Sequence, residues 1–301
     1  MSSLLTNSSA MTALQTLRSV SSQLSTTQSR ISTGQRVATA ADNAAYWSIA
    51  TSMRADNAAL SAVSDSLGLS AATVDTEYTA LNKVLGDSNS GLTKLQSLLV
   101  EAKTAGIDRT KIQSEITQIQ QDMKNVASAA TFNGVNWLST NASTPTTVNL
   151  VSSFSRVGST PTTSSITVTV ANYSLYTSST NGILDTVSGS ASVDSLNIGA
   201  LTDSAADQTI LDGYISKVTA AIGTVSSGAA NLGAIKNRIS NNSEFVKSLM
   251  DSVDRGIGQL VDADMNQEST RLAALQVQQQ LGVQALSIAN NNSQSILSLF
   301  R

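Results

Sequence analysis

Apolar residues recur at alternating steps of three and four along most of this 301-residue chain, which is the spacing of a coiled-coil seam. The longest seam starts at Leu211 and ends at Leu260, and twelve of its fifteen positions are apolar. It predicts one helix roughly 75 Å long, because an α-helix rises about 1.5 Å per residue.

Two further seams precede this one. The first runs from Leu60 to Ala102, and the second runs from Ile112 to Ala130. Between them, Gly106 is placed as a helix stop and Asp108 as an N-cap. We therefore expect the two helices to fold back on each other as a hairpin, with the seams as ordinary coiled-coil core.

The two ends of the chain carry weaker seams, which Ser21 and Gln28 interrupt near the N-terminus and Gln279, Gly282 and Ser293 interrupt near the C-terminus. Such helices are marginal alone and are expected to be stable only when they pack on others. Polar residues at the seam edges can form hydrogen bonds between subunits without burying a charge. The apolar positions expected to pack in the assembly, between helices and between subunits, are Leu14, Leu17, Leu24, Ile31, Leu272, Leu275, Leu286, Ile296 and Phe300.

The middle of the chain, residues 140–200, holds both prolines and loses the heptad spacing. Residues 166–170 (ITVTV) alternate like a strand, and Asn181-Gly182 predicts a hairpin turn. A second turn is expected at Asn133-Gly134, where the preceding helices end. The predicted fold is therefore mainly α, with long coiled-coil helices formed from both termini and a small β-rich central insert.

The composition excludes several kinds of function. The chain has no Cys and no His, which removes disulfides, thiol chemistry, the commonest general base and the commonest zinc ligand. We therefore expect no enzyme activity, no catalytic residues, no metal and no cofactor. A net charge of −3 implies no affinity for nucleic acid, and no run of 18 apolar residues suggests a membrane span. With only 13% charged residues, little repulsion opposes self-association.

Several long motifs, in the correct order, resemble those of bacterial flagellins. Residues 29–60 (SRISTGQRVATAADNAAYWSIATSMRADNAAL) are similar to the N-terminal signature of that family, and FNGVNWL at 132–138 resembles its Phe-Asn-Gly motif. LGAIKNRI at 232–239 is similar to its Leu-Gly-Ala-x-x-Asn-Arg segment, and residues 261–301 follow its closing signature. The short insert and Tyr46-Trp47 look most like flagellins of rhizobia and other alphaproteobacteria.

The resemblance implies a structural subunit that self-assembles into the hollow helical filament used for swimming. It implies that the chain is secreted to the extracellular flagellum by type III export, which fits the absence of a usual signal peptide. The implied partners are further copies of the chain, flagellin paralogues, the export apparatus and its chaperone, and the cap and hook-junction proteins. The alternative is a hook–filament junction protein, which shares the terminal helices; the closing signature and the lack of a large extra domain favour flagellin.

The resemblance also implies three parts. Residues 1–41 with 262–301 would form an inner-tube coiled coil, and residues 42–139 with 201–261 an outer-tube helical bundle. The insert at 140–200 would lie on the outside of the filament, where it could present an adhesive or glycan-bearing surface as a secondary role.

Residues 29–54 would then form a joint, where the inner helix continues into the outer one and neighbouring subunits meet. In this joint, Gly34 is placed to end the first helix. Partly buried arginine–carboxylate contacts across subunits would fix the register between protofilaments, whereas arginines that only solvate a loop would contribute little. The residues assigned to the joint are Arg30, Gly34, Arg36, Asp42, Arg54, Asp262, Asp264 and Glu268, with the acids as partners of the arginines.

The chain departs from the enteric pattern at residues 92–102. In enteric flagellins this stretch carries Arg and Glu and is recognised by the vertebrate Toll-like flagellin receptor. Here Lys94 keeps a charge, but Gln96 and Ser97 stand where Arg and Glu are expected. We therefore expect weak or no recognition by that receptor.

Three further expectations concern particular side chains. A zinc-protease insert, which some flagellins carry, needs the two His of an H-E-x-x-H helix and is excluded here. Trp47 and Trp137 are expected to be packing anchors. A group of carboxylates lacks the spacing of a calcium loop and is expected to be solvated or paired; its members are Asp251, Asp254, Asp262 and Asp264.

Overall fold

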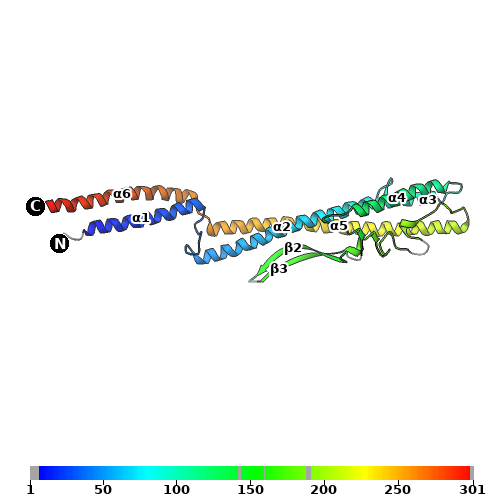
Figure 1. The fold of residues 1–301 in the computed structure, drawn as a ribbon, viewed down its shortest axis with the longest axis horizontal. Coiled ribbons are helices and arrows are strands. Elements are labelled where there is room, and N and C mark those ends of the chain that lie inside the picture. Colours follow the sequence, from blue (N-terminus) through cyan, green and yellow to red (C-terminus); the bar gives the residue numbers. More distant parts are fainter. Residues whose placement is uncertain (1–6, 142–143, 159, 188–190, 299–301) are drawn as a thin grey trace. The chain divides into compact units, whose positions relative to one another are not determined.

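The computed structural model describes residues 7–141, 144–158, 160–187 and 191–298, with side-chain surroundings described up to Asn291 (Figure 1). The fold is mainly α, as predicted. Its long helices in chain order are α1 (Ser8–Thr33), α2 (Ala44–Leu85), α3 (Gly91–Glu101), α4 (Arg109–Ala129), α5 (Ala205–Val261) and α6 (Met265–Ser298).

The chain forms two compact units. The terminal unit comprises residues up to 58 together with residues from 250 onward, and the central unit comprises residues 59–249. Helices α2 and α5 contribute residues to both units. The division into inner, outer and surface parts is a statement about a filament and stays a prediction.

The seam that starts at Leu211 lies within the single helix α5, as predicted. In the central unit its members Val218, Val225 and Leu232 are fully buried. An 18-residue window of α5 is as apolar on average as a membrane-crossing helix. In a helix whose seam is buried against other helices, such a window is typical of a protein core.

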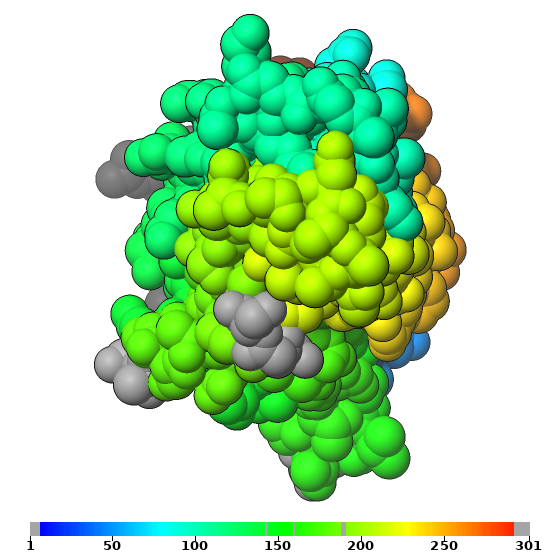
Figure 2. All heavy atoms as spheres, turned by 90° about the vertical axis from the view of Figure 1, so that its right-hand side faces the viewer, coloured from blue at the N-terminus to red at the C-terminus, as the bar shows by residue number. Residues whose placement is uncertain are grey.

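The α3–α4 hairpin is confirmed, and it covers one side of the start of α5 while the insert covers the other (Figure 2). Asp108 caps α4 by accepting a hydrogen bond from the Thr110 N–H at 3.1 Å, and Gly106 takes φ +82° in the connection. The buried Arg109 guanidinium then donates to the Ala102 carbonyl and pairs with Asp203 at 2.6 Å. This arginine joins the end of α3 to the segment that leads into α5.

The seam from Leu60 to Ala102 is not one helix, which corrects the sequence-based expectation. Helix α2 ends at Leu85 and α3 begins at Gly91. Gly86 and Gly91 take φ values of +70° and +65°, and a Cβ on Gly86 would lie 2.0 Å from the Ser90 carbonyl oxygen. Only glycine fits at position 86, so helix α2 ends before it. The apolar spacing continues in α3.

The insert contains an antiparallel ribbon of β2 (Thr147–Val157) and β3 (Thr160–Thr169), which includes most of the predicted strand at 166–170. Two short strands, β1 (Ser139–Thr140) and β4 (Tyr176–Thr177), pair in parallel. The single-turn 3-10 helices η1 (Val170–Asn172) and η2 (Val193–Ser195) complete it.

The predicted hairpin turn at Asn181-Gly182 is wrong, because the β2–β3 ribbon turns at Gly158 instead. The segment around Asn181 is a loop, which the Asp185 carboxylate closes by accepting from the N–H groups of Gly182 and Thr177. The predicted turn at Asn133-Gly134 is confirmed, with φ values of +50° and +78°.

A buried carboxylate joins α2 to the FNGVNWL segment. Glu77 is inaccessible to solvent, and its Oε1 accepts a hydrogen bond from the Trp137 N–H at 2.8 Å. Trp137 is itself fully buried, so its predicted role as a packing anchor is confirmed. Burial raises the pKa of Glu77 to about 7, against the lowering effect of the Trp137 hydrogen bond.

Replacing this carboxylate by an amide, Glu77→Gln, is expected to remove a pH dependence of stability. The folded-state pKa of Glu77 is raised, so its contribution to stability is fully present below the unfolded value near 4.5 and is lost as the pH rises through about 7. The loss is on the order of 3 kcal/mol. Denaturant unfolding, followed by circular dichroism at pH 5 and pH 8, measures it.

The amide introduced by Glu77→Gln keeps an acceptor for the Trp137 N–H. The free energy of unfolding of the variant should therefore rise relative to that of the wild type at pH 8 and not at pH 5. A matched control is Glu115→Gln, because Glu115 is half exposed and pairs with Lys94 at the surface. Equal pH profiles for the wild type and Glu77→Gln would contradict the expectation.

Candidate functional site

Helices α1 and α6 lie side by side in the terminal unit (Figure 1). The N-cap residue Asn7 accepts a hydrogen bond from the Ala10 N–H at 3.0 Å, and its side-chain amide donates to the Ala289 carbonyl of α6 at 3.0 Å. At the other end, Gly34 follows α1 with φ +71°, which is the helix end that the sequence predicts. Capping and pairing of the two helices are therefore coupled at the start of α1.

The inward face of α6 follows the weak seam expected from the sequence. Leu275 is buried, Leu272 and Leu286 are half-buried, and the seam passes through Gly282. A Cβ on Gly282 would lie 3.2 Å from Leu17, so this glycine allows close contact with α1. Ile296 lies within α6, but its side chain is outside the described part, and Phe300 lies outside the described residues.

The register of α1 differs from the expectation. The seam passes through Val20 and Thr27, which are buried, instead of Ser21 and Gln28, which are exposed. Leu14 is 37% exposed in the single chain, so it lies off the α1–α6 contact, and its assignment to contacts between subunits stays a prediction. The remaining assigned residues of α1 are half-buried, namely Leu17, Leu24 and Ile31. The burial of Thr27 was not predicted, because a polar residue is usually taken to interrupt an apolar seam.

The α1–α6 pair leaves large apolar side chains uncovered. On α6, Val277, Leu281 and Ile288 recur at steps of four and seven and are 54%, 57% and 68% exposed. Val283 of α6 and Met11 of α1 are also more than half exposed. Apolar residues therefore lie on the outward face of α6 as well as on its seam, a pattern of helices that are covered on more than one side.

One of the predicted joint arginines pairs with a predicted joint acid. Arg30 in the last turn of α1 contacts Glu268 in the first turn of α6, with 3.1 Å between Nη1 and Oε1. Glu268 is buried and Arg30 is largely buried. The cation lies at the negative end of one helix dipole and the anion at the positive end of the other, so both dipoles favour the pair. Arg30 Nε and Glu268 Oε2 have no hydrogen-bond partner among the described residues.

Within one chain, Arg36 and Asp42 of the joint make other contacts than an ion pair. Arg36 donates to the Leu260 carbonyl at 3.2 Å, and its backbone N–H donates to the Val261 carbonyl at 2.6 Å. Asp42 closes a turn by accepting hydrogen bonds from the Thr39 N–H and hydroxyl, which lower its pKa. These contacts fold the connection from α1 to α2 onto the end of α5.

The remaining joint residues form no ion pair among the described residues. Asp264 caps α6 by accepting from the N–H groups of Asn266 and Gln267. Asp262 forms a backbone bridge with Gln35. Arg54 is exposed and makes no ion pair with a described carboxylate. Within the described chain, one of the joint arginines, Arg30, therefore forms a pair with a joint carboxylate, and pairing of Arg36 and Arg54 across subunits stays a prediction.

Trp47 is not a packing anchor, which corrects the sequence-based expectation. Ala50 is fully buried and packs with Ile257 and Val261 of α5, while Met53 is half-buried on the same cluster. Trp47 in the preceding turn of α2 is 36% exposed.

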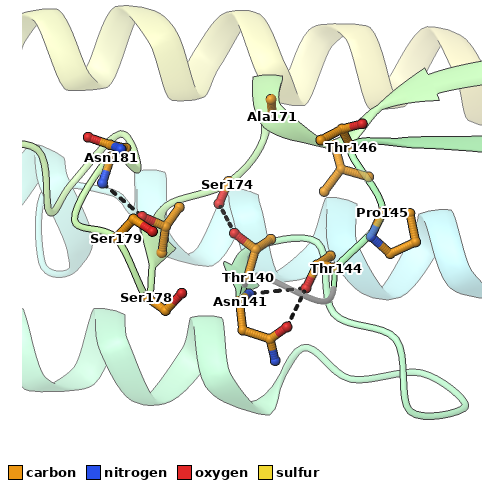
Figure 3. A pocket seen from close by; sticks show the side chains of 12 residues that line it. Thr140, Asn141, Thr144, Pro145, Thr146, Ala171, Ser174, Ser178, Ser179 and Asn181 are labelled. Atoms are coloured by element: carbon orange, nitrogen blue, oxygen red, sulfur yellow. Dashed lines mark hydrogen bonds between the residues drawn. The ribbon is translucent and has the colours of Figure 1, made fainter.

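Within the described residues, no group of His, Cys, Asp or Glu side chains is arranged to hold a metal ion. A hollow of about 270 Å³ on the insert is lined by hydroxyls, the two amides of Asn141 and Asn181, and apolar atoms (Figure 3). The Thr140 and Ser174 hydroxyls bond each other there at 2.7 Å, and Asn141 and Thr144 bond each other beside them. Among the described residues that line this hollow none is ionisable, and those with polar side chains offer hydrogen bonds.

A double-mutant cycle is expected to give a coupling energy of about 1–3 kcal/mol between Arg30 and Glu268, because removing one partner leaves a largely buried charge. The variants are Arg30→Gln, Glu268→Gln and the double substitution, compared by thermal unfolding of the full chain.

The matched control is the exposed pair of Lys111 and Asp108, whose coupling should stay below about 0.5 kcal/mol. Equal coupling in the two cycles would show that burial does not strengthen the Arg30–Glu268 pair.

Comparisons with known proteins agree with this geometry. The family profile described as bacterial flagellin N-terminal helical region matches residues 4–143, and the profile described as bacterial flagellin C-terminal helical region matches residues 215–300. The chain is 47% identical to the flagellin of Brucella melitensis biotype 1 and 44% identical to flagellin C of Rhizobium meliloti strain 1021; each match covers 100% of both chains. Flagellin A of the same Rhizobium strain is 39% identical, again over 100% of both chains. The chain belongs to the bacterial flagellins, the structural subunits of the flagellar filament.

Proposed function

We propose that copies of the chain pack against one another in the filament through the outward faces of α1 and α6. The observation that carries this proposal is the uncovered apolar row of Val277, Leu281 and Ile288 on α6. Full burial of one such side chain contributes about 1.5–3 kcal/mol relative to exposure. A single α1–α6 pair cannot supply that burial, whereas a ring of neighbouring pairs would cover the outward face of each.

The α1–α6 pair is weak within one chain, which also supports the proposal. Over the described part of α1, only Val20 and Thr27 are buried, and one of these is polar. Because most of the stability of a helix comes from packing of its apolar face, helices with so little buried surface need further packing partners. Polymerisation would therefore stabilise both helices while it covers their apolar residues.

We assign residues 1–41 with 262–301 to the inner tube of this filament, residues 42–139 with 201–261 to the outer tube, and residues 140–200 to its outer surface. The exposed tip of the β2–β3 ribbon, where Val157 is 77% exposed, fits an outer position. The chain would be exported unfolded and would meet the export apparatus, its chaperone, the cap, the hook-junction proteins and flagellin paralogues. No observation favours a hook–filament junction protein.

Leu281→Asn is expected to raise the critical concentration for polymerisation by about tenfold or more, because it removes roughly 1.5 kcal/mol or more of apolar burial per subunit. Leu281 is exposed in the monomer, so the monomer's circular dichroism spectrum and melting curve should stay unchanged. Sedimentation and negative-stain electron microscopy measure the polymer.

Val157→Asn is the matched control, since Val157 is exposed but lies in the insert. Its critical concentration should equal that of the wild type. A Leu281→Asn chain that polymerises as the wild type does would refute the role of this α6 face.

Recognition by the vertebrate flagellin receptor is expected to be weak, as the sequence predicts. Lys94 pairs with Glu115 at 3.2 Å, and the Gln96 amide donates to the Thr219 hydroxyl at 2.8 Å, so neither presents a free charge. In a receptor reporter assay, the potency of this chain should be at least about tenfold lower than that of an enteric flagellin. The reason is that a hot-spot arginine contributes more than about 1.4 kcal/mol to binding. Equal potency would contradict this expectation.

A further inference from the structure

The sequence contains two Asn-Gly pairs, Asn133-Gly134 and Asn181-Gly182. In such a pair the glycine nitrogen can attack the carbonyl carbon of the asparagine side chain, because glycine has no Cβ to hinder the approach. Both asparagines therefore carry the same intrinsic reactivity. The structure holds the two pairs in different surroundings, so their reactivity in the folded chain should differ.

The first pair forms an exposed turn. Asn133 and Gly134 take φ values of +50° and +78°, and both residues are exposed. The turn is closed by the backbone hydrogen bonds that Phe132 and Val135 exchange, each at 2.9 Å. Within the described residues, neither the Asn133 amide nor the Gly134 N–H has a hydrogen-bond partner. Local opening of this turn therefore breaks few contacts and brings the two reacting groups together.

The second pair is enclosed. Gly182 is buried, and its N–H donates to the Asp185 carboxylate. A Cβ on Gly182 would lie 2.4 Å from the Leu175 carbonyl oxygen, so the backbone has little room to rotate. The Leu184 N–H also donates to the Leu175 carbonyl at 2.9 Å. Attack on Asn181 must first break a hydrogen bond to a carboxylate, and hydrogen bonds to charged groups are among the stronger ones.

We propose that Asn133 is a site of spontaneous covalent modification, deamidation through a succinimide, and that the fold protects Asn181 from the same reaction. The Gly134 nitrogen loses its proton to hydroxide, and its lone pair forms a bond to Cγ of Asn133. The side-chain nitrogen takes a proton from water and leaves as ammonia, so a succinimide ring remains. Water then adds to one of the two ring carbonyl carbons and breaks the bond from that carbon to the ring nitrogen. Addition at Cγ gives aspartate, and addition at the backbone carbonyl carbon gives isoaspartate.

Both products would loosen the segment that follows α4. Isoaspartate adds one atom to the main chain, which changes the size of a turn that Phe132 and Val135 close by hydrogen bonds. Aspartate adds a negative charge shortly after α4, at the negative end of the helix dipole. The turn directly precedes Asn136, whose amide donates to the Ala127 carbonyl of α4 at 2.7 Å. Modification of Asn133 would therefore weaken the contact between the FNGVNWL segment and α4.

Peptide mapping by mass spectrometry measures both asparagines in one chain. The purified full chain is incubated at pH 8, folded or in guanidinium chloride, and the conversion of each asparagine is followed over time. In the folded chain, Asn133 should deamidate about tenfold faster than Asn181 or more, because that ratio corresponds to the barrier that one hydrogen bond to a charged group supplies. In guanidinium chloride the two rates should be similar, since glycine follows both asparagines.

Asp185→Asn tests the protection of Asn181. The substitution removes the charge that holds the Gly182 N–H and nearly keeps the shape of the side chain. The deamidation rate of Asn181 should rise severalfold, because hydrogen bonds to neutral acceptors are weaker than those to carboxylates. Asn133 in the same chain is the matched control and should react at its wild-type rate, and the melting curve checks that the variant folds.

Ion exchange separates the modified chain from the intact chain by its added negative charge. The chain modified at Asn133 should unfold at a lower temperature, measured by circular dichroism. Equal melting temperatures would overturn the loosening of the segment after α4.

Equal rates at the two asparagines in the folded chain would overturn the proposal. A preference for Asn133 that persists in guanidinium chloride would overturn it as well, because the difference would then lie in the neighbouring residues and not in the fold. An unchanged rate at Asn181 in Asp185→Asn would overturn the protective role of that carboxylate. The reaction takes place within one chain, so none of these results depends on assembly into filaments.

Discussion

The constraint on which this structure depends is that an apolar seam on a long helix must be covered along its length. In the central unit this requirement is met within one chain, because α2, α3, α4 and the insert supply apolar side chains such as Leu81, Leu95 and Ile116 that are fully buried. In the terminal unit it is met only in part. Helices α1 and α6 have each other, and Leu281 and Ile288 remain outside that contact. A chain whose apolar seams are covered in one unit and partly uncovered in the other is suited to assembly with copies of itself, which would cover the rest.

Charged residues are few, and several of those that are buried lie where helices end or segments meet. Arg109 ties the end of α3 to the approach to α5, Arg30 and Glu268 join two helix ends, and Glu77 joins α2 to the backbone of Trp137. At such places the seam cannot specify the geometry, because apolar contact is not directional. Hydrogen bonds and ion pairs are directional, so a small number of them can fix the angle and register that the seams leave open.

Much of this architecture is predictable from the sequence, because helical periodicity and caps are local properties. The extent of α5, the α3–α4 hairpin and the helix end at Gly34 follow from spacing and glycine position. The break at Gly86 does not, since the apolar spacing stays in phase across it, and the true α1 seam includes the polar Thr27. The partners of the joint arginines depend on which loops fold onto α5. No local pattern carries that information, so the Arg30–Glu268 contact could be expected while the backbone partner of Arg36 could not.

The distribution of uncovered apolar side chains bears on how one sequence can serve as both monomer and polymer. They lie on several different faces, on the outward side of α6 and at the start of α2, with polar residues such as Ser48, Gln278 and Gln280 between them along the chain. A single large patch would promote non-specific association. Several smaller ones each contribute too little to hold two chains together, but a neighbour that covers them at once gains their sum. Specific polymerisation then requires that all of these surfaces match simultaneously, and a geometry that satisfies only one of them would be too weak to persist.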